Sequence, residues 1–198
     1  MSIFGYTQFM SHAIYQTPAV ILKTRNYQES NKLLVMYTRD FGLVYVAAQS
    51  LRSAQSKMKY HTLLYSLVEI DVVKGKDLWR LTGIHQQISS LSFVQKNWFP
   101  LLEKFASLLV RLIPGEEPHL EVWNELENLY TLIENDEYHE SIEYILIARI
   151  LYYLGYWSSN EPIILDENPY TEGMYQWVQE HKKELVVKIN QGLNDSQL

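Results

Sequence analysis

A group of positive charges without neighbouring acids is the first feature of this sequence that could do chemistry. Arg52, Lys57 and Lys59 lie among small polar residues in the stretch AAQSLRSAQSKMKYH, residues 47–61, and residues 41–68 contain no Asp or Glu. Ammonium and guanidinium groups on such a segment can meet phosphates without a fixed geometry. They can equally be solubilising surface charge, so the local sequence leaves both interpretations open.

The charge of the whole chain is unevenly divided between its two halves. The formal net charge is -6, yet residues 1–92 contain ten Lys or Arg and five Asp or Glu, a net +5. Residues 93–198 contain seven Lys or Arg and 18 Asp or Glu, a net -11. This asymmetry predicts a polyanion-binding first half and a second half with another role. Two ordinary solvated surfaces would have the same composition.

The residue patterns of nucleotide enzymes, hydrolases and metalloproteins are missing. No two of the eight glycines are closer than eight positions, so no glycine-rich loop can surround a phosphate with backbone amides. The six histidines are scattered without a His-x-x-x-His pair, and cysteine is absent, which excludes disulfides and thiolate zinc sites. We therefore expect no catalytic residues, no cofactor and no metal, and we do not expect an enzyme.

The composition indicates a folded protein of the cytoplasm. Hydrophobic residues make up 47% of the 198 residues, which is enough for a real core. No stretch resembles a membrane span or a signal peptide. A second Met-Ser pair begins at Met10, so this methionine is a possible alternative start. We expect residues 1–11 to be a loosely ordered extension.

The first half has the pattern of short β-strands. AVILKTRNY, KLLVMYTRDFGLVYVAA, LLYSLVEIDVV and LWRLTGI are rich in β-branched and apolar residues. Asp40-Phe41-Gly42 predicts a hairpin turn within the second stretch, and Lys74–Asp77 a turn before the last. Apolar residues at even positions from Leu64 to Val72 predict a strand with one buried face. About five antiparallel strands that avoid bare edges favour a small barrel.

The second half changes to helical spacing. Apolar residues recur every three or four positions after Pro100, again after Leu120 and again after residue 136, where Asn135 or Asp136 could cap the third helix. Gly155 would end that helix, and residues 171–193 predict one broken helix or two short ones. The expected fold class is α+β, with a barrel domain at residues 12–86 and a helical protein-interaction domain at residues 87–198.

Several pieces of the first half, taken together, resemble the bacterial recombination mediator family RecO. VILKTRNYQES, LLVMYTRDFGLVYVAAQS, LRSAQSKMKY and SLVEIDVVKGKDLWRLTG are similar to that family in order and spacing over roughly residues 14–84. ILYYLGYW and INQGLNDSQL resemble pieces of its second domain and C-terminus. Many members carry a four-cysteine zinc module after the Leu-Gly stretch, whereas this chain has SSNEPIILDENPYTEG there. Zinc is therefore not implied, and we expect an abbreviated helical domain.

The resemblance implies a DNA repair and recombination mediator with an oligonucleotide-binding (OB) barrel. Relatives bind single- and double-stranded DNA, anneal complementary strands, and work with RecR and the single-strand-binding protein SSB to load RecA. The resemblance makes Arg52, Lys57 and Lys59 candidate phosphate contacts. Further candidates at expected strand ends and turns of the barrel are Arg25, Arg39, Lys74, Lys76 and Arg80.

Bases would stack on aromatic faces of such a barrel. The candidate platforms are Tyr37, Tyr45, Tyr60 and Trp79, although aromatic residues in strands also serve as packing. In relatives a pocket of the helical domain takes the acidic tail of SSB. The cations available for that contact are Lys96, Lys104, Arg111 and Arg149, which could instead form surface or internal pairs. The alternative function is a non-enzymatic protein-interaction adaptor with an OB-like barrel.

Overall fold

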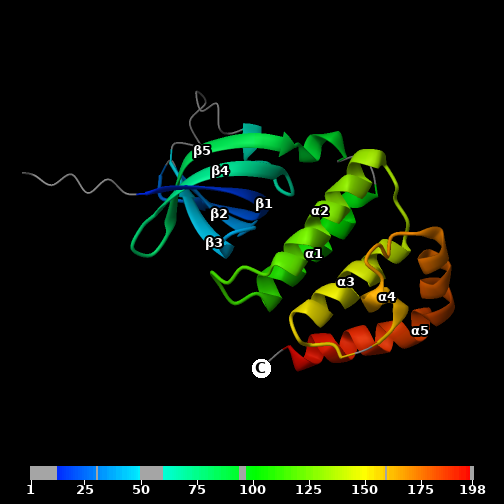
Figure 1. Ribbon diagram of the computed structural model, residues 1–198. Coiled ribbons are helices and arrows are strands. Elements are labelled where there is room, and N and C mark those ends of the chain that lie inside the picture. Colours follow the sequence, from blue (N-terminus) through cyan, green and yellow to red (C-terminus); the bar gives the residue numbers. More distant parts are fainter. Residues whose placement is uncertain (1–12, 30, 50–59, 94–96, 159, 197–198) are drawn as a thin grey trace, which may run out of the picture.

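The chain folds into a β-barrel followed by helices, as the sequence predicts. The structure is a computed structural model, and it describes residues 13–29, 31–49, 60–93, 97–158 and 160–196. Figure 1 shows the strands at one end of the molecule and helices α3 to α5 at the other, with α1 and α2 between them. The predicted extension, residues 1–11, lies outside the described residues, and the predicted domain boundary after residue 86 falls within the last strand, β5.

Five strands close the barrel in the order β1-β2-β3-β5-β4, with β4 pairing back onto β1. They are β1 (Ile14–Tyr27), β2 (Asn31–Thr38), β3 (Gly42–Ala48), β4 (Leu67–Lys74) and β5 (Trp79–Ile88). The long β1 pairs with β4 through its first half and with β2 through its second half, and its register shifts between Ile21 and Lys23. Among the strand pairs of the described residues, only β3 and β5 are parallel, and their pairing closes the sheet. This arrangement is that of the OB-fold.

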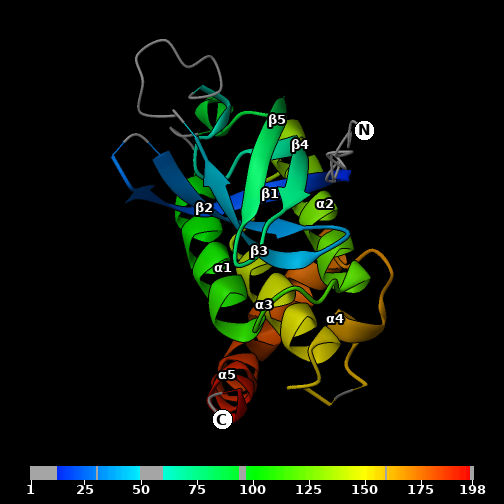
Figure 2. The ribbon, with the colours of Figure 1, turned by 90° about the vertical axis from the view of Figure 1, so that its left-hand side faces the viewer.

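Alternating side chains fill the barrel interior. Val68, Ile70 and Val72 of β4 point inward, which confirms the prediction from their even spacing. They pack with inward residues of the other strands, among them Ile21 and Met36. Figure 2 looks at the molecule from the barrel side and shows the strands wrapping around this interior. The period of two in the sequence therefore placed the barrel core correctly.

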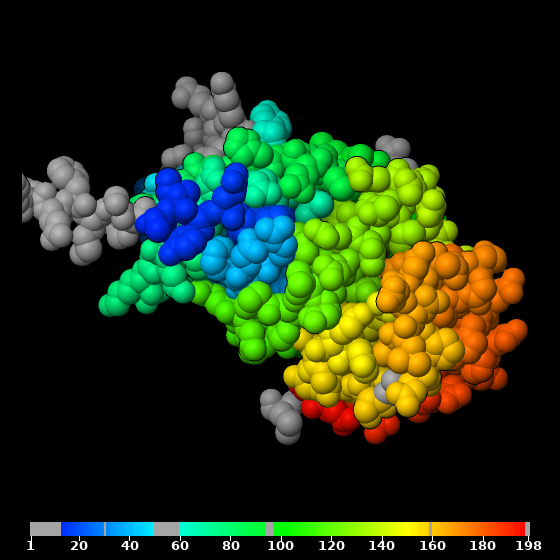
Figure 3. Space-filling model, in the orientation of Figure 1, coloured from blue at the N-terminus to red at the C-terminus, as the bar shows by residue number. Residues whose placement is uncertain are grey.

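One outer face of the barrel packs against helices α1 (Trp98–Leu112) and α2 (Leu120–Asn135). The Tyr37 hydroxyl donates to the carbonyl oxygen of His119 at 3.1 Å, and the Tyr130 hydroxyl of α2 donates to that of Tyr65 at 2.6 Å. Both tyrosines belong to one apolar core that extends through the helices. In Figure 3 the green helices lie directly against the blue and cyan strands. Barrel and helices are thus joined by a continuous core.

The segment between these helices, residues 113–119, is called here the α1–α2 connection and is fastened to the barrel. The Leu43 amide of β3 donates to the carbonyl oxygen of Gly115 at 3.0 Å. Gly42 has φ +66°, and a Cβ atom there would lie 2.2 Å from the carbonyl oxygen of Glu117. The predicted Asp40–Gly42 turn is confirmed, and its glycine serves both the turn and this close approach.

The remaining helices are α3 (Ser141–Tyr153), α4 (Pro162–Leu165) and α5 (Glu172–Asp195), and the 3-10 turn Ser90–Ser92 follows the barrel. A buried ion pair ties α2 to α3: the Arg149 Nε atom lies 2.7 Å from Glu125 Oε1. The segment between α3 and α5, residues 154–171, is called here the α3–α5 connector. Arg149 also donates to three of its carbonyl oxygens, those of Ile163, Ile164 and Asp166. The Tyr170 hydroxyl donates to the second oxygen of Glu125 at 2.6 Å.

Two helix predictions are wrong in detail. Asp136 does not cap α3 but ends α2 in the left-handed conformation, with φ +59°, and the residue before α3 is Glu140. The last helix is neither broken nor double, since α5 runs unbroken for 24 residues from a Thr171 side-chain cap. Gly155, with φ +81°, follows the end of α3 as predicted. Within the described residues, no helix is long and apolar enough to cross a membrane.

Candidate nucleic-acid interface

A hollow of about 290 Å³ opens at one end of the barrel. Three separate segments form it: the β1–β2 turn, the end of β3 and the β4–β5 turn. Its lining includes Tyr27, Ala47, Lys74, Trp79 and Arg80. In OB-folds oligonucleotides bind to the face of strands 2 and 3 and to these same two turns. The hollow therefore lies where this fold places a nucleic-acid strand.

Four predicted cations lie at or beside this hollow. Lys74 and Arg80 line it, and Lys76 is exposed on the β4–β5 turn, which projects from the barrel in Figure 3. Arg25 is exposed on β1 two residues before Tyr27, so both side chains leave the same face of the strand. The structure thus brings four of the predicted phosphate contacts to one end of the barrel.

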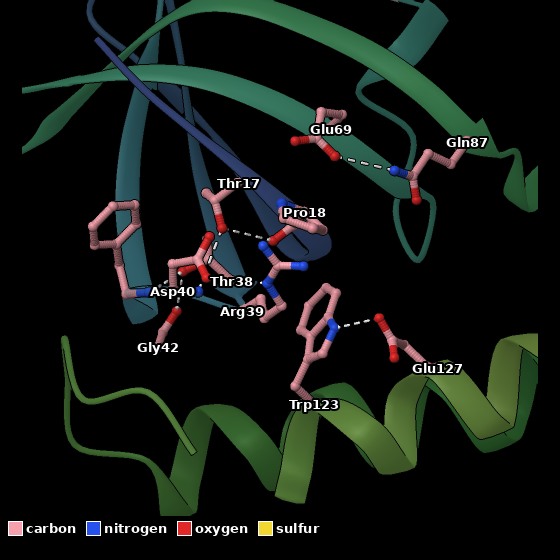
Figure 4. A network of polar contacts seen from close by, with 11 residues as sticks. Thr17, Pro18, Thr38, Arg39, Asp40, Gly42, Glu69, Gln87, Trp123 and Glu127 are labelled. Atoms are coloured by element: carbon pink, nitrogen blue, oxygen red, sulfur yellow. Dashed lines mark hydrogen bonds and ion pairs between the residues drawn. The ribbon is translucent and has the colours of Figure 1, made fainter. Parts of the chain in front are cut away.

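Arg39 lies elsewhere, at the other end of β2, and its role stays a prediction. It follows β2, whose opposite end, at Asn31, lines the hollow. Its Nε atom lies 3.0 Å from Asp40 Oδ1, and the hydrogen bond and charge of Asp40 raise the pKa of the guanidinium. Figure 4 shows Arg39 beside Thr17 and Asp40, on the side of the barrel that faces α2. The carboxylate of Asp40 therefore already pairs with this partly exposed cation.

The predicted loop cations Arg52, Lys57 and Lys59 lie outside the described residues, and their role stays a prediction. The described chain reaches Gln49 on one side, which lines the hollow, and Tyr60 on the other.

The four predicted stacking platforms divide into two buried and two exposed rings. Tyr37 is fully buried against Trp123, and burial raises the pKa of its hydroxyl. Trp79 is 2% exposed and packs against Phe41. The stacking prediction is therefore wrong for Tyr37 and Trp79, because a base cannot reach either face. Their rings serve packing, which the sequence had left as an open alternative.

Tyr45 and Tyr60 remain available to a base. Tyr45 is 42% exposed, and it leaves the same face of β3 as Ala47, which lines the hollow. Tyr60 is 73% exposed. Tyr27, which sequence reasoning did not select, is half-buried in the lining of the hollow itself. Its place in the turn sequence NYQES was the one signal that could have indicated it.

A carboxylate from the helical part reaches the edge of the hollow. Glu116 of the α1–α2 connection accepts from Lys74 Nζ at 2.7 Å through one oxygen and from Trp79 Nε1 at 2.8 Å through the other. Burial tends to raise the pKa of Glu116, but these two bonds outweigh it and hold the pKa below its ordinary value. Sequence reasoning missed Glu116 because it lies 37 residues beyond Trp79.

Of the four cations predicted for an SSB-tail contact, three lie among the described residues. Arg149 is buried in its ion pair with Glu125, so the prediction is wrong for this residue. Lys104 pairs with Glu143, and Arg111 donates to the carbonyl oxygen of Leu193 at 2.6 Å. Lys96 lies outside the described residues. In the described ranges, no group of three or more His, Asp or Glu is arranged to hold a metal ion.

Comparison with known proteins agrees with this geometry. Residues 10–87 match the family model described as "Recombination protein O N terminal". The chain is 26% identical to the "DNA repair protein RecO" of Desulfitobacterium hafniense over 149 residues, which cover 72% of this chain and 52% of that protein. It is 29% identical to the "DNA repair protein RecO" of Clostridium perfringens over 157 residues, 73% of this chain and 59% of that protein.

A shorter match has a higher identity and falls on a smaller region. The "DNA repair protein RecO" of Clostridium novyi is 31% identical over 72 residues, 36% of this chain and 28% of that protein. The chain spans about half the length of the first curated relatives that it matches. The matched model covers the whole described barrel apart from the last residue of β5. Through this barrel, residues 10–87 of the chain are similar to the N-terminal part of RecO proteins.

Proposed function

We propose that this chain is a DNA repair and recombination mediator whose barrel binds single- and double-stranded DNA at the hollow. The observation that carries the proposal is the convergence of Arg25, Lys74, Lys76 and Arg80 on the end of the barrel where OB-folds hold oligonucleotides. The relatives' name, DNA repair protein, supports it. The proposal places the protein at the bacterial nucleoid, in the cytoplasm.

Cations and exposed rings have separate tasks in this proposal. The ammonium and guanidinium groups neutralise backbone phosphates, whatever the base sequence. Tyr45, beside the hollow, offers a face on which a base can stack. Two strands held this way repel each other less and can find their complementary register. Annealing by this route needs no hydrolysis, so the proposed protein is not an enzyme.

The helical part would serve protein contacts, since its net charge of -11 repels DNA. With RecR, the protein would help to load RecA on single strands covered by SSB. Of the cations suggested for the acidic SSB tail, Lys104 and Arg111 stay exposed. Titration of a fluorescent SSB-tail peptide with the whole chain at low salt tests this contact, and absence of binding contradicts it.

The DNA proposal is tested with a fluorescein-labelled oligothymidylate strand and fluorescence anisotropy over a range of salt concentrations. A double variant, Lys74→Gln with Arg80→Gln, removes two cations of the hollow. Its matched control removes two cations of α5, Lys182→Gln with Lys183→Gln. If two phosphate contacts are lost, the slope of log affinity against log salt becomes shallower by about 1.4 units for a single strand. The control should keep the wild-type slope.

If the wild type, the Lys74→Gln/Arg80→Gln variant and the control have equal DNA affinities and equal salt slopes, DNA binds outside the hollow. No binding of any strand at low salt would reject the proposal and favour the protein-interaction adaptor. A triple Ala variant of Arg52, Lys57 and Lys59 extends the same test to the loop cations. That variant should weaken binding alike for all base sequences.

A further inference from the structure

One cation of the hollow is already occupied by a carboxylate of the same chain. Lys74 is the only described lining residue of the hollow that forms an ion pair with the helical part, and its partner is Glu116. The Lys74 and Glu116 side chains are 60% and 43% exposed, so water reaches both groups. A phosphate that enters the hollow therefore meets a lysine whose charge is partly neutralised.

We propose that Glu116 is a built-in competitor for phosphate, which DNA displaces from Lys74 when it binds. This inference rests on the proposed function, since it assumes that phosphates enter the hollow. It adds that the helical part sets the affinity of the barrel for DNA. The carboxylate occupies the position that a phosphate oxygen would take beside the lysine.

The geometry lets Lys74 leave while Glu116 stays. The two oxygens of Glu116 have separate partners, so the bond from Trp79 Nε1 persists when the lysine turns away. The backbone beside Glu116 is fixed to the barrel by the bond from Leu43 to Gly115. Only the long lysine side chain has to move. Its ammonium lies 5.2 Å from the centre of the Trp79 ring, a contact that can persist while it changes its anion.

The expected effect is modest because the competing pair is exposed. Exposed ion pairs contribute little, so loss of the competitor should tighten DNA binding by about two- to fivefold. When wild-type protein binds DNA, it must break the ion pair between Lys74 and Glu116, which costs free energy. A variant without the Glu116 charge has no ion pair to break. In the variant the slope of log affinity against log salt should steepen by up to about 0.7 units for a single strand.

The test compares Glu116→Gln with Glu117→Gln. Glutamine at position 116 can still accept from the Trp79 indole, so the fold around it should persist, as far-UV circular dichroism will check. Glu117 is the adjacent exposed carboxylate. The hydrogen bonds from Lys74 and Trp79 go to Glu116 and not to the Glu117 side chain. The control therefore removes the same charge at nearly the same distance from the hollow.

A double-mutant cycle with Lys74→Gln shows whether the effect passes through the contact. We expect tighter binding of oligothymidylate by Glu116→Gln than by Glu117→Gln, and no gain from Glu116→Gln when Lys74 is already Gln. Equal gains in both glutamate variants, or a gain that survives in the Lys74→Gln background, would overturn the inference.

The two proposals fail in different ways. If wild type binds DNA and Lys74→Gln weakens binding, but Glu116→Gln gives no gain, the competitor is rejected and the hollow stands. If Lys74→Gln leaves DNA binding unchanged, the hollow as the DNA site and the competitor are rejected together.

Discussion

Removing one member of the buried ion pair between Glu125 and Arg149 should strongly destabilise the helical part. The side chains are 2% and 6% exposed, so neither can regain water when its partner is removed. Arg149→Met keeps most of the side-chain volume but leaves the Glu125 charge buried with only the Tyr170 hydroxyl as a partner. Removing one member of a buried pair typically costs about 3–5 kcal/mol.

Arg149 also holds the α3–α5 connector, which adds to the expected loss. Its guanidinium donates to carbonyl oxygens of that connector, the closest being Asp166 at 2.7 Å. We therefore expect the unfolding free energy of Arg149→Met to lie about 3–5 kcal/mol below that of the wild type. Urea unfolding followed by tryptophan fluorescence and far-UV circular dichroism gives this difference.

The chain offers an exposed ion pair as a matched control. Lys104 and Glu143 also join two helices, but their side chains are 60% and 33% exposed, so Lys104→Met should cost at most about 1 kcal/mol. The double variant Arg149→Met with Glu125→Gln removes both charges and should cost less than the sum of the single changes. Equal losses for Arg149→Met and Lys104→Met, or strict additivity in the double variant, would refute the reasoning.

Three further predictions concern the junction of barrel and helices. Gly42→Ala should destabilise the protein by about 1–3 kcal/mol, because φ is +66° and a Cβ atom would meet backbone atoms. Gly115→Ala has open space around the new Cβ atom and should change the free energy of unfolding by less than about 0.5 kcal/mol. Similar losses for the two variants contradict this prediction. Tyr130→Phe leaves the buried carbonyl of Tyr65 without its 2.6 Å bond and should cost about 1–3 kcal/mol in urea unfolding, and a neutral result contradicts it. The pKa of Glu116 is depressed by its bonds in spite of burial, so its charge stabilises the fold at neutral pH and this stabilisation is lost as pH falls through the folded pKa. The stability difference between wild type and Glu116→Gln should therefore shrink below about pH 4, and a difference that stays constant with pH refutes the assignment.

Local sequence patterns were enough to predict the architecture. Alternation at Val68, Ile70 and Val72 identified a barrel strand, and Gly42 identified its hairpin, because both signals depend on neighbours within a few residues. Helical spacing located α1 to α3 for the same reason. Predictions failed where two local interpretations compete: Asp136 can begin one helix or end another, and packing along α5 decided in favour of one long helix.

Candidate side chains could be chosen by type from the sequence, but not sorted by environment. An aromatic ring in a strand can face a base, a helix or the barrel interior, and only the packed structure shows that Tyr37 and Trp79 are buried while Tyr45 is not. Likewise, Arg149 is a cation whose carboxylate partner lies 24 residues away on another helix.

The sequence by itself determined the order of barrel and helices, the division of charge between them and the chemical class of the candidate site. Tertiary structure alone decided that Lys74 and Arg80 meet Tyr27 in one hollow, and that Glu116 reaches that lysine from the helical part. The physical reason is the range of each signal. Hydrophobic period and turn chemistry act between near neighbours, whereas a site assembled from distant segments exists only after the chain has closed its barrel and packed its helices.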